Sequence, residues 1–206
     1  MLKNNIISSV TGIVYTEPIV VFSPDKCLSF EVSVLRKSGQ RDLVNIITTD
    51  LECNVSKGDS VRVSGFLYTY QSPPKEYPRF RVCLYSLGIV KTNFATNKNV
   101  IIFQGVVVKK PQHRLTPSGI RICELLIAVN NDINGLYASY VPCIVWNEDA
   151  TIVKDYKIGT AICGVGRLQS REYTKLVDGV ERTFLTRELS INSYKLLETD
   201  NGHESI

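Results

Sequence analysis

Residues 98–111, KNVIIFQGVVVKKP, repeat in outline residues 5–18, NIISSVTGIVYTEP, and this repeat decides the fold. Gly12 and Gly105 lie 93 residues apart, and the same offset aligns prolines and a glutamate further along the chain. Beyond them the offset grows to 101 residues. The glycines paired at this larger offset are Gly58 with Gly159 and Gly65 with Gly166. Identities held in register, with the same apolar alternation, indicate two copies of one structural unit.

Apolar and polar residues alternate along most of both copies, which is typical of strands with one buried face. Leu28–Val34, LSFEVSV, is a clear example. In the second copy the pattern predicts strands at about 100–110, 119–130, 138–146, 160–172 and 181–195. A helical pattern is rare and is best at about 148–156, where Glu148 and Asp149 suit the positive helix N-terminus.

Turn signals separate these strands. Asn134-Gly135 and Asp178-Gly179 favour tight hairpins, and Ser38-Gly39 marks the first of these turns in the first copy. In that copy the loop Ser72–Pro78 replaces the second turn. Each copy therefore reads as three strands, a short helix and two more strands.

This order describes the OB-fold, a small, partly open barrel that binds oligonucleotides and oligosaccharides. An SH3-like barrel is the structural alternative, but it has no helix at that place. We expect an all-β chain of two tandem five-stranded OB-fold barrels, each with a short helix between its third and fourth strands. The expected boundaries are 1–91 for a divergent first domain, 98–197 for the second domain and 198–206 for a short acidic tail.

Composition excludes several classes of protein. Of the 206 residues, 44% are hydrophobic and 21% are charged, which argues against disorder. No apolar run approaches the roughly 20 residues of a membrane span, and no signal peptide begins the chain, so we expect a cytoplasmic protein. The six cysteines lack metal or redox spacing, and we expect them to be small buried thiols. A disulfide framework is the less favoured alternative.

The formal net charge of +4 is the sum of parts of opposite sign. Residues 1–97 carry 11 basic and 8 acidic residues, and residues 98–197 carry 13 and 9. The tail adds three acidic residues and no basic one. Each copy is therefore mildly basic, which permits a nucleic-acid partner.

Five segments of the second copy are similar to segments of one protein family and occur in the same order. They are Gly105–Pro111, Arg114–Gly119, Leu126–Asn130, Tyr140–Trp146 and Gly166–Tyr173. These segments resemble the bacterial single-stranded DNA-binding protein family, and the primosomal replication protein N branch of the same superfamily is similar. The first copy keeps only the glycine and proline skeleton. The resemblance implies OB-folds that bind single strands without sequence preference.

The resemblance also implies where bases stack. Tyr140 lies where the family commonly has a stacking aromatic residue, Trp146 matches a second, and Tyr173 matches a third on the hairpin between strands four and five. Arg167 and Arg171 flank this hairpin position. Stacking suits a binder without sequence preference because every base has a π-face. Packing against neighbouring strand residues is the alternative for Tyr140 and Trp146.

Basic residues are candidates for phosphate contacts. Lys109, Lys110, His113 and Arg114 form the densest basic run, in the loop after the first strand, which borders the binding face of an OB-fold. Lys175 on the hairpin is a further candidate, and a solvated face is its alternative. The candidates in the first copy are Tyr68, Tyr70, Arg79 and Arg81, while Arg36, Lys37 and Arg41 cluster at its earlier hairpin. We expect the first copy to bind more weakly or to serve mainly in assembly.

These features predict sequence-non-specific single-stranded DNA binding in DNA replication, recombination or repair, in association with the nucleoid. The alternatives are a primosome-type accessory protein that contacts a helicase or loader, and an RNA-binding OB-fold protein. The expected assembly is a homodimer with four barrels or a monomer with docked barrels, and replication proteins are further partners. The tail lacks the Pro-Phe ending of the family, so recruitment through it is not favoured.

An enzyme is not expected. His113 and His203 are not framed by catalytic partners, and the sequence has no Gly-Lys-Ser/Thr phosphate loop and no metal-ligand cluster. We therefore expect neither a cofactor nor a metal.

Overall fold

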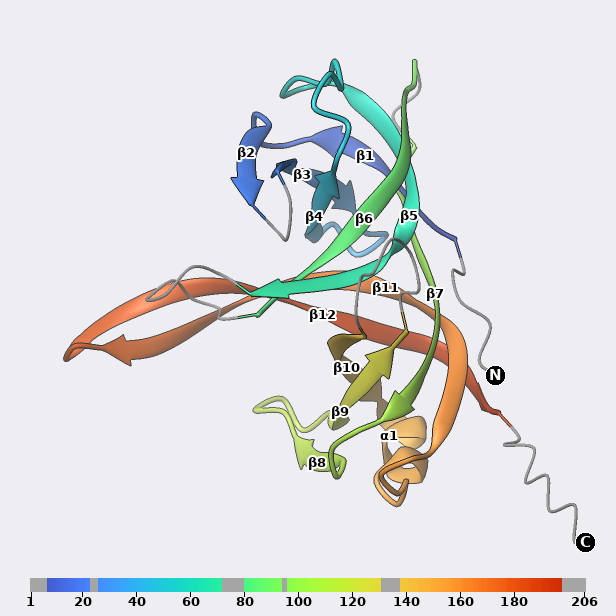
Figure 1. The fold of residues 1–206 in the computed structure, drawn as a ribbon. Helices are drawn as coiled ribbons and strands as arrows, with labels where there is room; N and C mark the ends of the chain where they lie inside the picture. Colours follow the sequence, from blue (N-terminus) through green and yellow to red (C-terminus); the bar gives the residue numbers. More distant parts are fainter. Residues whose placement is uncertain (1–6, 23–25, 72–79, 94–95, 131–137, 198–206) are drawn as a thin grey trace, which may run out of the picture.

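The structure, a computed structural model, describes residues 7–22, 26–71, 80–93, 96–130 and 138–197. The first unit runs from β1 to β6 and the second unit from β7 to β12 (Figure 1). The strands of the first unit are β1 (Ser8–Val14), β2 (Ile19–Phe22), β3 (Lys26–Leu35), β4 (Arg41–Thr48), β5 (Ser60–Gln71) and β6 (Phe80–Lys91). Those of the second unit are β7 (Lys98–Val107), β8 (Gln112–Leu115), β9 (Arg121–Val129), β10 (Ser139–Trp146), β11 (Ala161–Val177) and β12 (Val180–Leu196), with helix α1 (Asn147–Val153) after β10.

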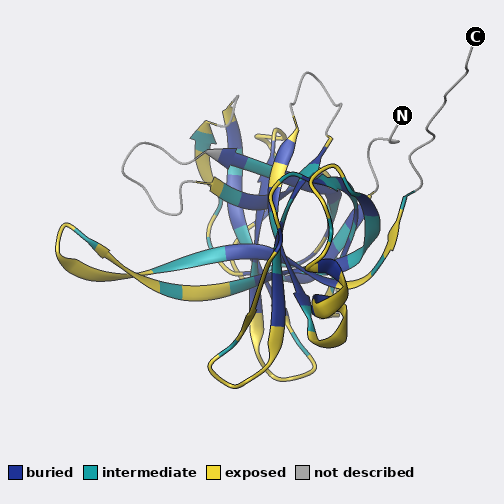
Figure 2. Cartoon of the chain, turned by 90° about the horizontal axis from the view of Figure 1, so that it is seen from below, coloured by how far each residue is buried: buried dark blue, intermediate teal, exposed yellow. Residues whose placement is uncertain are grey.

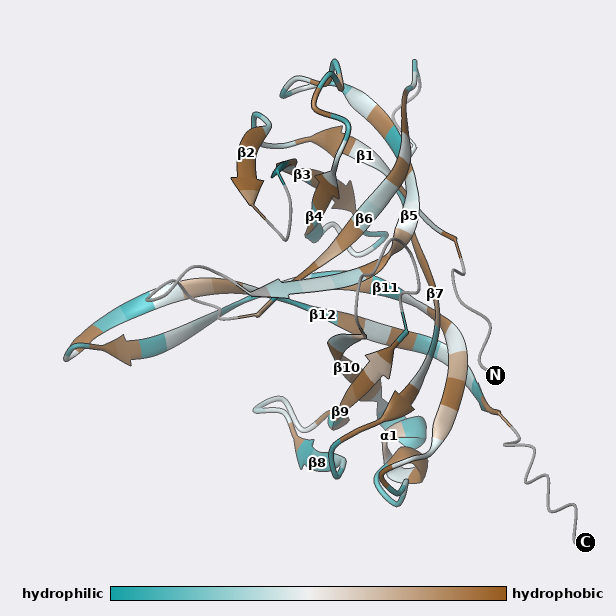
Figure 3. Ribbon diagram, in the orientation of Figure 1, coloured by the Kyte–Doolittle hydropathy of each residue, from teal (hydrophilic) through white to brown (hydrophobic). Residues whose placement is uncertain are grey.

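Each unit closes into a barrel in the same way. Most neighbouring strands are antiparallel, while β4 and β6, and likewise β10 and β12, pair in parallel. The first strand of each unit also pairs with the long strand of the hairpin that follows it. Thus β1 pairs with β3, and β7 pairs with β9. The apolar residues that alternate along these strands form the buried core of the barrels. Figure 3 shows how hydrophobic residues, in brown, are distributed along the strands. The expected fold of two tandem OB-fold barrels is confirmed.

The prediction of a helix between the third and fourth strands of the first unit is wrong. Residues 49–59 form two short turns and irregular structure, whereas the second unit has α1 at the equivalent place. The connection from Thr48 to Ser60 is three residues shorter than that from Trp146 to Ala161. Side chains of the shorter connection also bind the backbone of the same segment. For example, Asp50 Oδ1 accepts a hydrogen bond from the Glu52 N–H at 3.1 Å. Such local bonds compete with helix formation.

Strands β2 and β8 were not expected from the sequence. Each has only four residues and forms a hairpin with the next strand, β2 with β3 and β8 with β9. The Asp178-Gly179 turn is confirmed, with φ of 52° and 77° as a two-residue hairpin turn requires. Asn134-Gly135 and the loop 72–78 lie outside the described residues.

The glycines of the repeat have the same physical role in both units. Gly65 of β5 and Gly166 of β11 each lie at a register shift, where one residue of the partner strand is left unpaired, Leu87 of β6 and Asn192 of β12. A Cβ at Gly65 would lie 2.0 Å from the Tyr85 carbonyl oxygen, and one at Gly166 would lie 2.4 Å from the Ser190 carbonyl oxygen. Only glycine lets the two backbones approach this closely. The repeat thus marks the bends that make a barrel.

This close approach gives a prediction for Gly166. Substitution by alanine places a methyl group against the backbone of β12, which cannot move without disturbing the ladder, and is expected to lower the free energy of unfolding by about 1–3 kcal/mol. Urea denaturation measures the change. Gly88→Ala is the matched control, because a Cβ at Gly88 meets nothing within 4 Å. Equal stability of the two variants contradicts the steric role.

The two units are joined by backbone pairing. Strand β1 pairs with β7 through Ser9 with Val100, Val10 with Asn99 and Thr11 with Lys98, so that the strands of both units form one twelve-stranded sheet. The Ser8 hydroxyl adds to this seam, accepting from the Ile102 N–H at 3.1 Å. The first strands of the two barrels, β1 and β7, therefore pair with each other within one chain.

A second seam between the units is polar. The buried Asp42 carboxylate accepts hydrogen bonds from Arg36 Nε at 2.8 Å and from the Ser170 N–H at 3.1 Å. In return, Ser170 Oγ accepts from the Leu43 N–H at 3.0 Å. Arg187, only 8% exposed, donates from Nε to the Leu43 carbonyl at 2.8 Å and forms an ion pair with Glu31. Strand β4 of the first unit is thus docked on the β11–β12 hairpin of the second.

Candidate nucleic-acid interface

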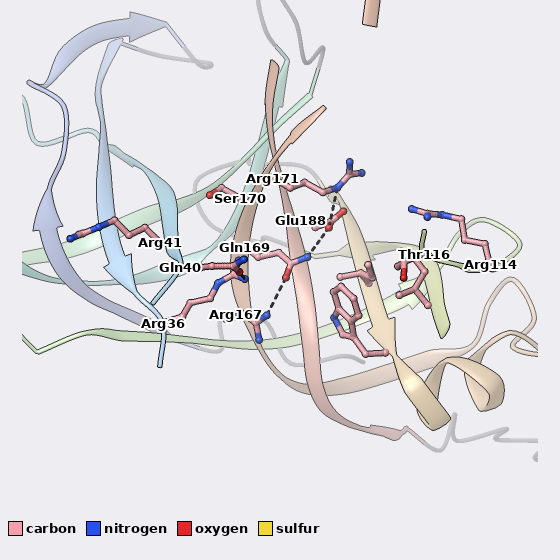
Figure 4. A pocket seen from close by; sticks show the side chains of 13 residues that line it. Arg36, Gln40, Arg41, Arg114, Thr116, Arg167, Gln169, Ser170, Arg171 and Glu188 are labelled. Atoms are coloured by element: carbon pink, nitrogen blue, oxygen red, sulfur yellow. Dashed lines mark hydrogen bonds and ion pairs between the residues drawn. The ribbon is translucent and has the colours of Figure 1, made fainter. Parts of the chain in front are cut away.

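A cleft of about 570 Å³ lies where the β3–β4 hairpin of the first unit faces the second unit (Figure 4). The second unit forms most of its wall, from β8, β9, β10, β11 and β12. Five of the thirteen lining residues are arginines, and Glu188 is the one acidic residue among them. The arginines are Arg36, Arg41, Arg114, Arg167 and Arg171. A hollow of this kind favours anions.

Hydrogen bonds fix the positions of the polar side chains on the wall. Gln169 donates from Nε2 to Glu188 Oε1 at 2.8 Å, and Arg171 donates from Nε to the same oxygen at 3.2 Å. Arg167 Nη2 donates to Gln169 Oε1 at 3.2 Å, which completes the chain drawn in Figure 4. The hydrogen bond to the buried Glu188 carboxylate thus holds the Arg171 guanidinium at the cleft.

Arg167 is in an unfavourable environment for a cation. Burial, and after it the charge of Arg36, lower the pKa of Arg167, while the Asp42 carboxylate partly offsets them. Arg167 Nε lies 3.8 Å from Asp42 Oδ2, which is too long for a hydrogen bond. A bound anion would relieve this repulsion between arginines.

Trp146 is the last residue of β10 and is half-buried in the wall of the cleft. Its indole Nε1 donates to Ser190 Oγ at 3.0 Å, which fixes the ring edge. Tyr140 stands on the same side of β10, since residues an even number apart share a face of a strand, and it is 52% exposed. The sequence-predicted aromatic residues of β10 therefore lie along one face.

A smaller hollow of about 200 Å³ continues this face. Lys109 and Lys110 line it together with Pro142 of β10, and it shares Arg171 and Glu188 with the cleft. The structure therefore brings the predicted basic run of the first loop to the same surface as Trp146. Arg114 is held at the cleft by an exposed ion pair, Nη2 to Glu124 Oε1, of 2.6 Å.

The β11–β12 hairpin carries the surface outward. Its outer half extends away from both units, to the left in Figure 1, and changes from buried to exposed along its length in Figure 2. Residues paired across antiparallel strands share a face, so Tyr173 stands with Phe184 and Lys175 with Arg182. The Tyr173 and Phe184 ring centroids are 5.7 Å apart. One face of the hairpin is therefore aromatic and basic.

The opposite face of the hairpin has a different character. It pairs Glu172 with Leu185 and Leu176 with Glu181. The basic face continues from Arg171 in the cleft, two residues before Tyr173. Sequence reasoning did not assign Phe184 or Arg182 to the site, although the strand register from the Asp178-Gly179 turn carries that signal.

The candidates of the first unit are corrected by the structure. Tyr68 and Tyr70 are 8% and 9% exposed and belong to an apolar cluster with Phe66 and Cys83, so their rings are not free to stack on bases. Burial is the main cause that raises the pKa of Tyr70. Arg81 is half-buried in the adjacent strand β6. Arg79 lies outside the described residues.

The repeat explains this correction. At the offset of 101 residues, Phe66, Tyr68 and Tyr70 of β5 occupy the places of three polar residues of β11. Those residues are Arg167, Gln169 and Arg171. The same face of the barrel is therefore aromatic and buried in the first unit, where Arg187 of the second unit packs near Tyr70, and cationic in the second.

Comparisons with known proteins fit this division. A model of the single-strand binding protein family matches residues 97–197. Single-stranded DNA-binding protein 2 of Listeria monocytogenes is 32% identical over 110 residues, which cover 51% of this chain and 67% of that protein. The chain belongs to the single-strand binding protein family. Single-stranded DNA-binding protein 1 of Staphylococcus aureus (strain COL) is 32% identical over 112 residues, or 52% of this chain and 65% of that protein. The chain thus spans just under two thirds of that relative.

Solved structures with both units are also similar. A deletion mutant of the single-stranded DNA binding protein from Thermus aquaticus has a TM-score of 0.74 at 17% identity and covers 100% of both chains. The wild-type protein gives 0.72 at 16% identity, over 96% of this chain and 95% of that one. The tandem arrangement of this family member is therefore a known fold.

Three further findings concern other kinds of site. None of the described helices is long and apolar enough to cross a membrane. In the described ranges, no three His, Cys, Asp or Glu side chains group as metal ligands. The six cysteines are free thiols, and four of them are buried.

Proposed function

We propose that this chain binds single-stranded DNA without sequence preference, as a binding protein and not an enzyme, in DNA replication, recombination or repair. One observation carries the proposal: Tyr140, Trp146 and the Tyr173–Phe184 pair follow one another along the surface that also holds the arginines of the cleft. Aromatic rings that stack on bases and cations that track the backbone are what a non-specific single-strand binder needs. The family membership and the relatives' names support it.

The proposed path of the strand follows from these positions. Lys109 and Lys110 and the cleft arginines contact phosphates, while the aromatic residues stack on bases. The basic face of the hairpin, with Lys175 and Arg182, guides the strand outward. We place this activity in the cytoplasm, at the nucleoid, where single strands form during replication and repair.

Titration of the protein with oligothymidine, followed by Trp146 fluorescence, tests the proposal. Binding is expected to quench the fluorescence, because a stacked base contacts the indole ring. Absence of both quenching and a spectral shift at low salt contradicts it. Competition by an RNA oligonucleotide of equal length distinguishes an RNA-binding protein, which would release the DNA at equimolar competitor.

Salt dependence is a separate prediction. If the four arginines of the cleft other than Arg36, which is paired with Asp42, each neutralise one phosphate, the affinity is expected to fall roughly fiftyfold between about 50 and 200 mM NaCl. Fluorescence anisotropy of a labelled oligothymidine at a series of salt concentrations measures the slope. An affinity that is independent of salt contradicts the assignment of the cleft to phosphates.

We also propose that two chains associate, which brings four barrels together. The family resemblance supports this number, and the two docked barrels of each chain supply half of it. Mass measurement of the free protein and of its complex with oligothymidine tests it. A free protein with the mass of one chain, 23.1 kDa, contradicts it.

A further inference from the structure

We infer that the β3–β4 hairpin of the first unit is a phosphate-binding wall of the second unit's site, so that one bound strand contacts both units. This inference rests on the proposed single-strand binding. It assigns to the first unit a role that its own barrel face, filled by the aromatic cluster, does not support.

The hairpin is rigidly placed at the cleft. Its turn is closed by the Arg36 N–H, which donates to the Gln40 carbonyl at 2.7 Å, and the Leu35 N–H donates to Asn97 Oδ1 at 2.8 Å. Just beyond the turn, Asp42 and Leu43 bond to Ser170 of β11. These contacts hold the hairpin against the wall that carries Arg167 and Arg171 (Figure 4).

The two arginines of the hairpin differ in what balances their charge. Arg36 forms a two-armed ion pair with the buried Asp42 and also donates from Nη1 to Gln40 Oε1 at 2.9 Å. The hydrogen bond to Asp42 raises the pKa of Arg36. Arg36 is therefore a structural cation whose charge is largely neutralised.

Arg41 is different. It is exposed and lines the cleft, but in Figure 4 its guanidinium extends away from Arg167 and Arg171. Its one hydrogen bond within the described residues runs from Nη1 to Ser33 Oγ of β3 at 3.2 Å. Among the described carboxylates, none lies within ion-pair distance of its guanidinium. An exposed guanidinium without a counterion, at the edge of a cleft with four other arginines, matches a phosphodiester group that enters the cleft.

The test compares two substitutions on this one hairpin. Arg41→Ala is expected to weaken binding of oligothymidine roughly fivefold at low salt and to reduce the slope of log affinity against log salt by about 0.7, the value for one phosphate on a single strand. Lys37→Ala removes the same charge from an exposed residue that does not line the cleft, and is expected to leave the slope unchanged. Arg41→Lys is expected to restore the slope.

The outcomes separate this inference from the proposed function. If the unaltered protein does not bind oligothymidine, the proposed function fails. If it binds, and the Arg41→Ala and Lys37→Ala proteins have the same affinity and slope, the hairpin inference alone fails. Thermal unfolding of both variants checks that each is folded, since neither side chain forms part of the buried seam.

Discussion

Replacing Trp146 by alanine is expected to weaken binding of oligothymidine about ten- to a hundredfold, because stacking of one base contributes about 1–3 kcal/mol. The indole ring is half-buried in the wall of the cleft and fixed by its bond to Ser190, so it meets a base without losing much side-chain freedom. Fluorescence anisotropy of a labelled oligonucleotide measures the loss, since the variant has no tryptophan of its own.

Two controls accompany this substitution. Trp146→Phe keeps a stacking ring and is expected to retain most of the affinity, although it loses the indole N–H. Tyr15→Ala removes a 51% exposed aromatic residue from the first unit, outside the proposed surface, and is expected to bind as the unaltered protein does. An affinity of the folded Trp146→Ala protein within twofold of the original would show that Trp146 is only a packing residue.

Replacing Asp42 by alanine is expected to lower the free energy of unfolding by about 3–5 kcal/mol, the usual cost of removing one partner from a buried ion pair. Asp42 is fully buried and accepts hydrogen bonds from both units. Without it, Arg36 and Arg167 repel each other across the seam, and the Ser170 N–H loses its acceptor. Urea denaturation, followed by circular dichroism, measures the change.

Glu124→Ala is the control for this prediction. It breaks the ion pair of Glu124 with Arg114, in which both side chains are more than one third exposed, and is expected to cost less than about 1 kcal/mol. A loss for Asp42→Ala that is no larger than for Glu124→Ala contradicts the role of the polar seam in holding the units together.

The barrels could be predicted from the sequence because their bends need glycine. Gly65 and Gly166 lie at equivalent bulges, and their spacing is visible without a structure. The missing helix of the first unit was not predictable from apolar spacing, since it depends on a connection shorter by three residues and on bonds such as that of Asp50 to its own backbone.

The residues of the candidate site also divide into those that could be predicted from the sequence and those that could not. Tyr140 and Trp146 share one strand, so their common face follows from period two. Tyr68 and Tyr70 show the same alternation, but the sequence does not say that their side of the barrel is buried beside Arg187. Arg41 lies 126 residues from Arg167 in the chain, and only the docking of the two units brings them to one cleft.

The pairing of β1 with β7 has a consequence for how the protein behaves on dilution. Both strands belong to one chain, and six residues connect β6 to β7, so the barrels meet at the millimolar effective concentration that a short tether provides. Unlike a contact between separate chains, this contact is not weakened when the protein is diluted. The composite cleft is therefore complete in a single molecule, even at the nanomolar protein concentrations at which tight binding is measured.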